Sequence, residues 1–174
     1  MLISLLAVLV GLVPPSPASR PVVGRITDAQ IFGTLSILDA AMIEAAKLGA
    51  SKGSSQEVRD YAGMLLSTHQ LSKRQGDSLA ARLGVTPALS SDKNTARDHI
   101  RAMERLKGQT GATFDWLFMS AMADDHESCM ARVDKLAKKA TNAELKAFIL
   151  KMQPDLARQM QVGRDWLNSH TRSD

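Results

Sequence analysis

Four long segments of the chain place apolar residues three and four positions apart, and this periodicity constrains the fold more than any other feature. Such spacing puts the side chains on one face of an α-helix, and the alternating pattern of a β-strand occurs nowhere. The first segment shows it at Ile31, Leu35, Leu38 and Met42. A chain of 174 residues is long enough for one domain with one continuous core. We therefore expect an all-α protein.

Capping residues predict where these helices begin. Ser or Thr followed three residues later by Glu or Gln favours a helix start, because the two side chains satisfy free backbone N–H groups. This pattern occurs at Thr27, Ser54 and Thr141, and glycines follow three of the apolar segments. The predicted helices, four long and one short, cover residues 28–52, 55–83, 95–107, 112–140 and 142–169.

The lengths of the connections predict how the helices are arranged. The turns near residues 51–54 and 140–141 are short, so each joins antiparallel neighbours, whereas residues 84–111 make a longer connection. We expect an up-down-up-down antiparallel four-helix bundle, with the short extra helix between bundle helices 2 and 3. The bundle domain covers residues 27–169, after a short lead-in at 20–26 and before a C-terminal tail at 170–174. We expect no internal repeat.

The first 19 residues carry no charge and predict export. An apolar run over residues 1–13 is too short to span a bilayer, but it has the length of a secretory signal and precedes three prolines. The alternative is a buried N-terminal segment. We expect residues 1–19 to be a signal peptide and the protein to be periplasmic or secreted, with outer-membrane association left open. The mature chain then contains no transmembrane span. The lone Cys129 fits an oxidising compartment and excludes an internal disulfide.

Charge and composition exclude several function classes. The net charge is only +4 and aromatic residues make up 4%, so nucleic-acid binding is not indicated. The sequence also lacks a Ser/His/Asp arrangement, a Gly-rich phosphate loop and a paired carboxylate suited to acid–base catalysis. We therefore favour a non-enzymatic protein over an enzyme. The sequence identifies no partner, and both envelope association and a homo-oligomer stay open.

Three polar residues interrupt the apolar seams at the middle of their helices. His69 and His126 each lie 14 residues from both ends of their predicted helices, so both are roughly 21 Å along their rods and at the same level. Gln159 falls within about one turn of that level. Asp39 is near the same height on the first helix, and Glu44 lies farther along it.

Inward-facing polar residues at one height are typical of metal sites in helical bundles. The candidate metal ligands are His69, His126, Glu44 and Gln159, and Asp125 could orient the ring of His126. A divalent ion of Fe, Zn or Cu is the expected occupant. The residues three positions before the histidines are Leu66 and Ala123, so the Glu-x-x-His pattern of di-iron sites is absent. Two alternatives remain, which are a purely structural polar layer and a Cu(I) or Zn site that includes Cys129.

Four segments of the chain, at residues 43–48, 58–69, 111–127 and 154–156, resemble those of a known family in order and spacing. Through them the sequence is similar to the domain-of-unknown-function family 4142 (DUF4142) over about residues 27–168, and that family comprises exported bacterial proteins with a ferritin-like bundle. The family pattern includes Glu44, His69 and His126. The chain departs from it at Thr68, where an acid is usual, and at Gln159, where a histidine is usual.

The resemblance implies a fold and export, and no activity. Taken together, the sequence predicts an exported ferritin-like bundle protein with a binding, envelope-associated or stress-related role. The alternative is a metal-binding bundle that uses His69 and His126.

Overall fold

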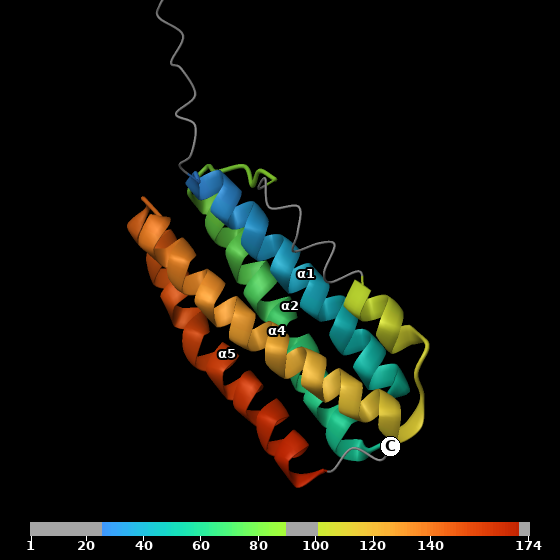
Figure 1. Cartoon of the computed structure of the whole chain (residues 1–174). Helices are drawn as coiled ribbons and strands as arrows, with labels where there is room; N and C mark the ends of the chain where they lie inside the picture. The colour runs from blue at the N-terminus through green and yellow to red at the C-terminus, as the bar shows by residue number, and fades with distance from the viewer. Residues whose placement is uncertain (1–25, 90–100, 171–174) are drawn as a thin grey trace, which may run out of the picture.

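The structure, a computed structural model, describes residues 26–89 and 101–170, and these form an all-α protein (Figure 1). The predicted signal peptide, most of the lead-in, and residues 95–100 of the predicted short helix lie outside the described residues. Residues 101–107 are helical. Each long helix begins and ends within one residue of its predicted bounds. The long helices are α1 (Asp28–Lys52), α2 (Gln56–Arg82), α4 (Gly111–Lys139) and α5 (Ala143–Ser169).

One of the three predicted helix starts is a complete capping box, and two are displaced by one residue. Thr27 and Gln30 satisfy each other's backbone N–H groups at the start of α1. Helix α2 is capped by Ser55 rather than Ser54, and α5 by Asn142 rather than Thr141. The predicted residues are displaced because their hydroxyl groups bind distant carboxylates instead of their own helices.

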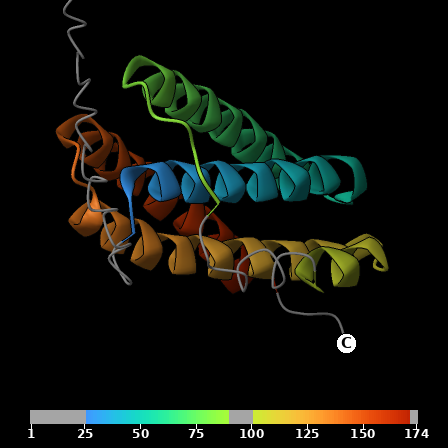
Figure 2. The same cartoon turned by 90° about the horizontal axis from the view of Figure 1, so that it is seen from above.

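The helices form two antiparallel hairpins, α1–α2 and α4–α5 (Figures 1 and 2). The direction of the second hairpin relative to the first differs from the up-down-up-down prediction. Asp115 at the start of α4 binds Ser54, which precedes α2, so α2 and α4 begin at the same end of the molecule. At the opposite end, Arg82 of α2 pairs with Glu144 of α5. Helices α2 and α4 therefore run in the same direction.

The up-down-up-down prediction is wrong because the long connection between α2 and α4 does not determine the direction in which α4 runs. At ~3.3 Å per residue, the segment between α2 and α4 is long enough for α4 to begin at either end of the molecule, beside the end of α2 or a full helix length away from it. The structure shows the second arrangement, since Lys52 at the end of α1 donates a hydrogen bond to the carbonyl of Lys107 at 2.6 Å. The helical residues 101–107 thus lie at the end of the molecule opposite to Arg82.

The two hairpins repeat one pattern at an offset of 87 residues. The first helix of each hairpin carries an aspartate whose carboxylate accepts two backbone N–H groups and one hydroxyl from the turn of the other hairpin. Asp28 binds Thr141 and Asn142 in this way, and Asp115 binds Ser54 and Ser55. Every one of these residues lies 87 positions from its counterpart.

Burial follows the same offset. Several buried positions of the first hairpin correspond to buried positions of the second, including the pairs Ile31/Phe118, Leu35/Met122, Val58/Leu145 and Ala62/Ile149. The expectation of no internal repeat is therefore wrong at the level of structure. Residue identity is seldom shared between the hairpins, so a comparison of letters alone does not find the repeat.

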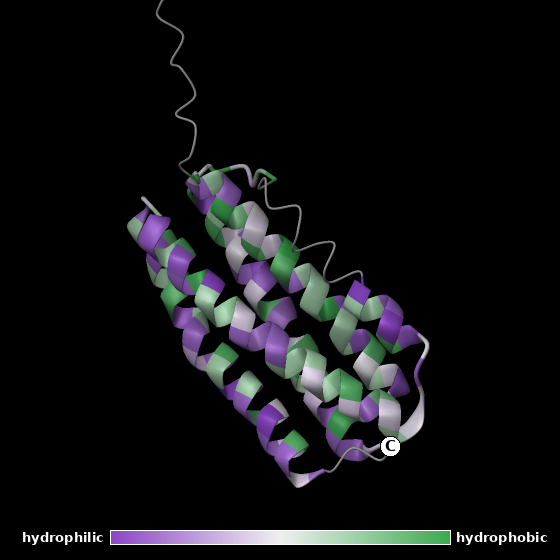
Figure 3. Cartoon of the chain, viewed as in Figure 1, coloured by the Kyte–Doolittle hydropathy of each residue, from purple (hydrophilic) through white to green (hydrophobic). Residues whose placement is uncertain are grey.

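The core consists of two apolar clusters separated by a layer of polar side chains. One cluster includes Val58, Leu65, Phe114 and Phe118, and the other includes Ile31, Leu35, Leu145 and Ile149. Hydrophobic and hydrophilic residues alternate along the helices in Figure 3, as expected of amphipathic helices. Among the residues described, no helix has an apolar stretch long enough to cross a membrane.

Candidate functional site

Each long helix contributes one buried polar side chain to the layer between the two apolar clusters. Asp39 of α1, His69 of α2, His126 of α4 and Gln159 of α5 are respectively 3%, 4%, 1% and 0% exposed. Polar groups this deeply buried destabilise a fold unless they find partners. The partners of each group therefore define what the layer can do.

His69 is oriented by a carboxylate. Its Nδ1 lies 2.8 Å from Oδ1 of Asp39, and the hydroxyl of Ser72 donates to Oδ2 of the same carboxylate at 2.9 Å. Since a carboxylate only accepts, Nδ1 of His69 carries the proton. The other ring nitrogen, Nε2, points away from Asp39 toward His126.

His126 is oriented by its own helix. Its Nδ1 donates to the backbone carbonyl of Met122 at 2.6 Å. The pKa of His126 is lowered to about 4, chiefly by burial and in part by nearby His69, whereas the Met122 carbonyl and Gln159 act in the opposite direction. His126 is therefore neutral at pH 7, with its proton on Nδ1 and a lone pair on Nε2.

The two Nε2 atoms face each other at 3.5 Å. This distance is long for a hydrogen bond between them. It is close to the separation of two ligands on one metal ion, because nitrogens 2.0–2.1 Å from a tetrahedral centre lie about 3.3–3.4 Å apart. Histidines that bind metals almost always donate their other N–H to a carboxylate or a carbonyl, as both of these do.

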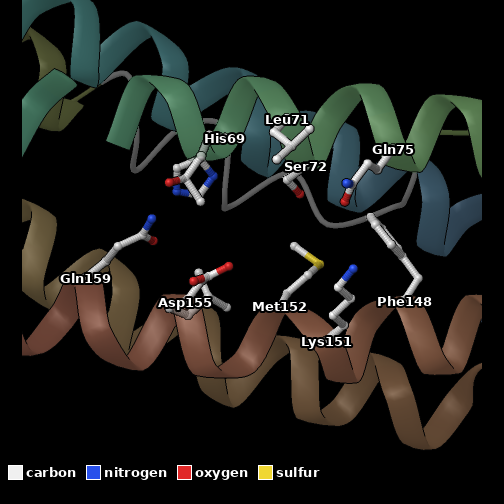
Figure 4. A pocket seen from close by; sticks show the side chains of 11 residues that line it. His69, Leu71, Ser72, Gln75, Phe148, Lys151, Met152, Asp155 and Gln159 are labelled. Atoms are coloured by element: carbon white, nitrogen blue, oxygen red, sulfur yellow. The ribbon is translucent and has the colours of Figure 1, made fainter. Parts of the chain in front are cut away.

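Gln159 brings an unsatisfied amide into the same layer. Neither its Oε1 nor its Nε2 has a hydrogen-bond partner of ordinary geometry, although the amide lies near enough to His126 to oppose the fall in its pKa. The backbone of Gln159 is anchored, since the hydroxyl of Tyr61 donates to its carbonyl at 3.0 Å. Figure 4 shows Gln159 projecting from α5 toward His69 beside a cavity of about 70 Å³.

A second cavity, of about 200 Å³, is lined mainly by α1 and α4 and reaches both histidines. Its lining includes three sulfur-containing side chains, those of Met42, Cys129 and Met152. Burial raises the pKa of the Cys129 thiol to about 12, and the charge of Asp39 adds to the effect. Cys129 is therefore a protonated thiol at neutral pH, and thiols bind metals as thiolates.

The structure brings together only part of the predicted ligand set. His69, His126 and Gln159 converge in the layer, whereas Glu44 is exposed and lines neither cavity. Asp125 lines the larger cavity, but the Nδ1 proton of His126 goes to the Met122 carbonyl instead. Within residues 26–89 and 101–170, no three His, Cys, Asp or Glu side chains are grouped to hold a metal ion. Any ion bound here must take additional ligands of another kind.

Sequence reasoning missed two groups of residues at this site. Ser72 and the Met122 carbonyl complete the hydrogen bonding, and Met42 and Met152 line the larger cavity. Ser72 lies one helical turn after His69 in an otherwise apolar seam, and that position was the available signal. A methionine in a seam gives no comparable signal, because it also fills cores.

Solved structures with a similar fold come from another family of unknown function. A DUF305 protein from Streptomyces coelicolor that is thought to be secreted matches with a TM-score of 0.70 and 15% identity, over 82% of this chain and 92% of that one. A DUF305 fragment from Deinococcus radiodurans matches with a TM-score of 0.72 and 13% identity, over 84% of this chain and 100% of that one. These likenesses show the fold alone.

No curated protein matches the sequence. The pattern of a protein family does, and it spans most of the chain, including all four residues of the polar layer. The match covers residues 13–165, and the chain thus belongs to the family described as Domain of unknown function (DUF4142).

Proposed function

We propose that this chain is an exported, non-enzymatic protein that binds one transition-metal ion in its buried polar layer. The apolar N-terminal run supports export, as does the similar fold of a protein thought to be secreted. The single long connection between the hairpins supports a ferritin-like four-helix bundle, a fold whose cofactor sites lie between facing helices.

The facing Nε2 atoms of His69 and His126 carry the proposal. Both rings are held by hydrogen bonds from Nδ1, so both Nε2 atoms are directed at one point before any ion arrives. Imidazole nitrogen suits Zn, Cu, Fe and Ni. The unsatisfied Oε1 of Gln159 supplies a third ligand, and its desolvation penalty is relieved when it binds the ion.

Binding rather than catalysis follows from the burial of the layer. The two histidines and Gln159 are at most 4% exposed, so a bound ion has little access to a substrate larger than water. Water can reach the ion from the adjoining cavity of about 200 Å³, so the burial limits access to the site without removing water from it.

Titration of the metal-free chain with Co²⁺, Zn²⁺, Ni²⁺ and Cu⁺ tests the proposal. We expect one equivalent of at least one ion to bind, and His69→Leu and His126→Leu each to abolish that binding. Leu in place of the neutral His126 keeps the layer packed, and His69→Leu is combined with Asp39→Leu so that no buried carboxylate is left without its partner; both variants should then fold. Gln159→Leu should weaken binding by roughly tenfold or more, as loss of even an outer partner of a metal ligand does.

His170→Ala is the matched control, because this histidine is exposed and stacks on Trp166 at 4.1 Å. Its binding curve should match that of the unmodified chain. If no ion binds at one equivalent, or if binding survives in both Leu variants, the layer is a structural element and the proposal is wrong.

A further inference from the structure

The larger cavity joins sulfur side chains to the two histidines. Its lining includes Met42 of α1, Cys129 of α4 and Met152 of α5 together with His69 and His126. Met42 and Cys129 are counterparts in the 87-residue repeat, so equivalent positions of the two hairpins both supply sulfur. Met152 also lines the smaller cavity, where Figure 4 shows it projecting from α5 toward α2 opposite Ser72.

Sulfur donors of this kind discriminate between metal ions. Thioether sulfur is a soft ligand that selects Cu(I), and hard or borderline ions gain little from it. A thioether has no proton to lose, so Met42 and Met152 can bind an ion at any pH. Cys129 differs from them, because its thiol must lose a proton before it binds strongly.

The charge of the site also favours a monovalent ion. Of the acidic and basic side chains that line the cavity, Asp125 and Arg132 are partly exposed, and Asp39 is the buried one. Asp39 is buried and reaches the ion through His69. An ion of charge +1 balances the buried carboxylate. A divalent ion leaves an uncompensated positive charge in an apolar interior, which destabilises the complex.

We propose that the ion bound between His69 and His126 is monovalent and soft, Cu(I) in the cell and Ag(I) as its stable substitute, and that Met42 and Met152 supply its sulfur ligands. This inference rests on the proposed metal-binding function and names the class of ion. The ligand set is then the two imidazole nitrogens, one or two thioether sulfurs and, where only one sulfur binds, the Oε1 of Gln159.

Competition titrations in the Cys129→Ala background test the inference without interference from the thiol. The reduced full chain is titrated with Cu(I) against a chromophoric Cu(I) chelator, then with Ag(I), Co²⁺ and Zn²⁺. We expect one equivalent of Cu(I) and of Ag(I) to bind more tightly than either divalent ion. Met42→Leu combined with Met152→Leu should weaken monovalent binding by roughly 10- to 100-fold or more, with divalent affinity unchanged.

Leu replaces Met with little loss of packing, so the double variant should fold. The matched control is Met160→Leu, a half-buried methionine of α5 that lines neither cavity. If divalent ions bind at least as tightly as Cu(I), or if the double variant keeps its monovalent affinity, the sulfur proposal is wrong and the histidine site stands. If none of the four ions binds, both proposals are wrong.

Discussion

The two hairpins of this protein are alike at their ends and different at their middles. At the ends, Asp28 and Asp115 make the same three hydrogen bonds to the opposite turn, 87 residues apart. At the middle, the same offset pairs Asp39 with His126, which differ in charge and in hydrogen-bonding capacity. The repeated hydrogen bonds at the ends join the two hairpins. The residues that differ at the middle belong to the candidate site.

The two hairpins differ in how their buried side chains at these levels are hydrogen-bonded. In the first, Asp39 accepts hydrogen bonds from both His69 and Ser72. In the second, Leu156 stands at the position equivalent to His69, and Gln159, equivalent to Ser72, has an amide with no partner. The two hairpins therefore share a backbone pattern and differ in how far their buried polar side chains find partners within the protein.

The largest expected difference concerns Asp39 and its counterpart His126. In metal-free protein, Asp39→Ala should lower the free energy of unfolding by about 3–5 kcal/mol, because it breaks a buried pair and leaves His69 and Ser72 without an acceptor. His126→Leu should change it by less than about 1 kcal/mol, since a neutral ring is replaced by an apolar side chain of similar size. Urea denaturation followed by tryptophan fluorescence measures both. Equal losses in the two variants would contradict the contrast between the hairpins.

The next largest effect is a pH dependence due to His126 alone. Its pKa is about 4 in the folded protein and 6.5 when unperturbed, so between these values the unfolded chain binds the extra proton. Stability is then fully present above pH 6.5 and falls by about 3 kcal/mol as the pH drops toward 4. Denaturation across this range, with a chelator present, should show that fall. His126→Leu should flatten it, and an unchanged slope in that variant would assign the effect to another group.

The smallest expected effects test the likeness of the two ends. Asp115→Ala should cost about 2 kcal/mol and Asp28→Ala about 1 kcal/mol, since Asp115 is buried and Asp28 is partly exposed. The two losses should add in the double variant, because the sites lie at opposite ends. Thermal and urea unfolding of the three variants measure this. A large loss in only one of them would show that the ends are not equivalent.

These two carboxylates also predict a second, more acidic transition. Burial alone would raise the pKa of Asp28 and of Asp115, but the hydrogen bonds from the opposite turns outweigh it and hold both pKa values below 3.8. Their contribution is present above pH 3.8 and is lost as the pH falls through the lowered values. It is therefore separated from the His126 effect, and Asp→Asn variants should remove it selectively.

The sequence located the long helices and the level of the polar layer well, for a physical reason. Helix periodicity and caps are local signals, so each boundary was found to within one residue. His69 and His126 lie near the centres of their helices, and the centre of a rod is at the same height whichever way the rod runs. The prediction that they lie level therefore does not depend on the helix directions, although those were partly wrong.

The ligand set beyond these residues could not be predicted in the same way. Glu44 and Asp39 are both polar residues near the apolar face of α1, and only the rotation of α1 in the packed structure decides that Asp39 is buried and Glu44 exposed. Met42 and Met152 line the larger cavity because α1, α4 and α5 meet there. No spacing within one helix encodes such a meeting.

What the sequence by itself determined was one-dimensional, namely the helices, their apolar faces and the height of each polar residue. Tertiary structure alone decided the direction of the second hairpin, the partner of each buried polar atom, and the 3.5 Å separation of the two imidazoles. The physical reason is that local propensities act over one or two helical turns. Partner choice instead depends on contacts between residues such as Asp39 and His69, or His69 and His126, which lie far apart in the chain and meet only when the helices pack.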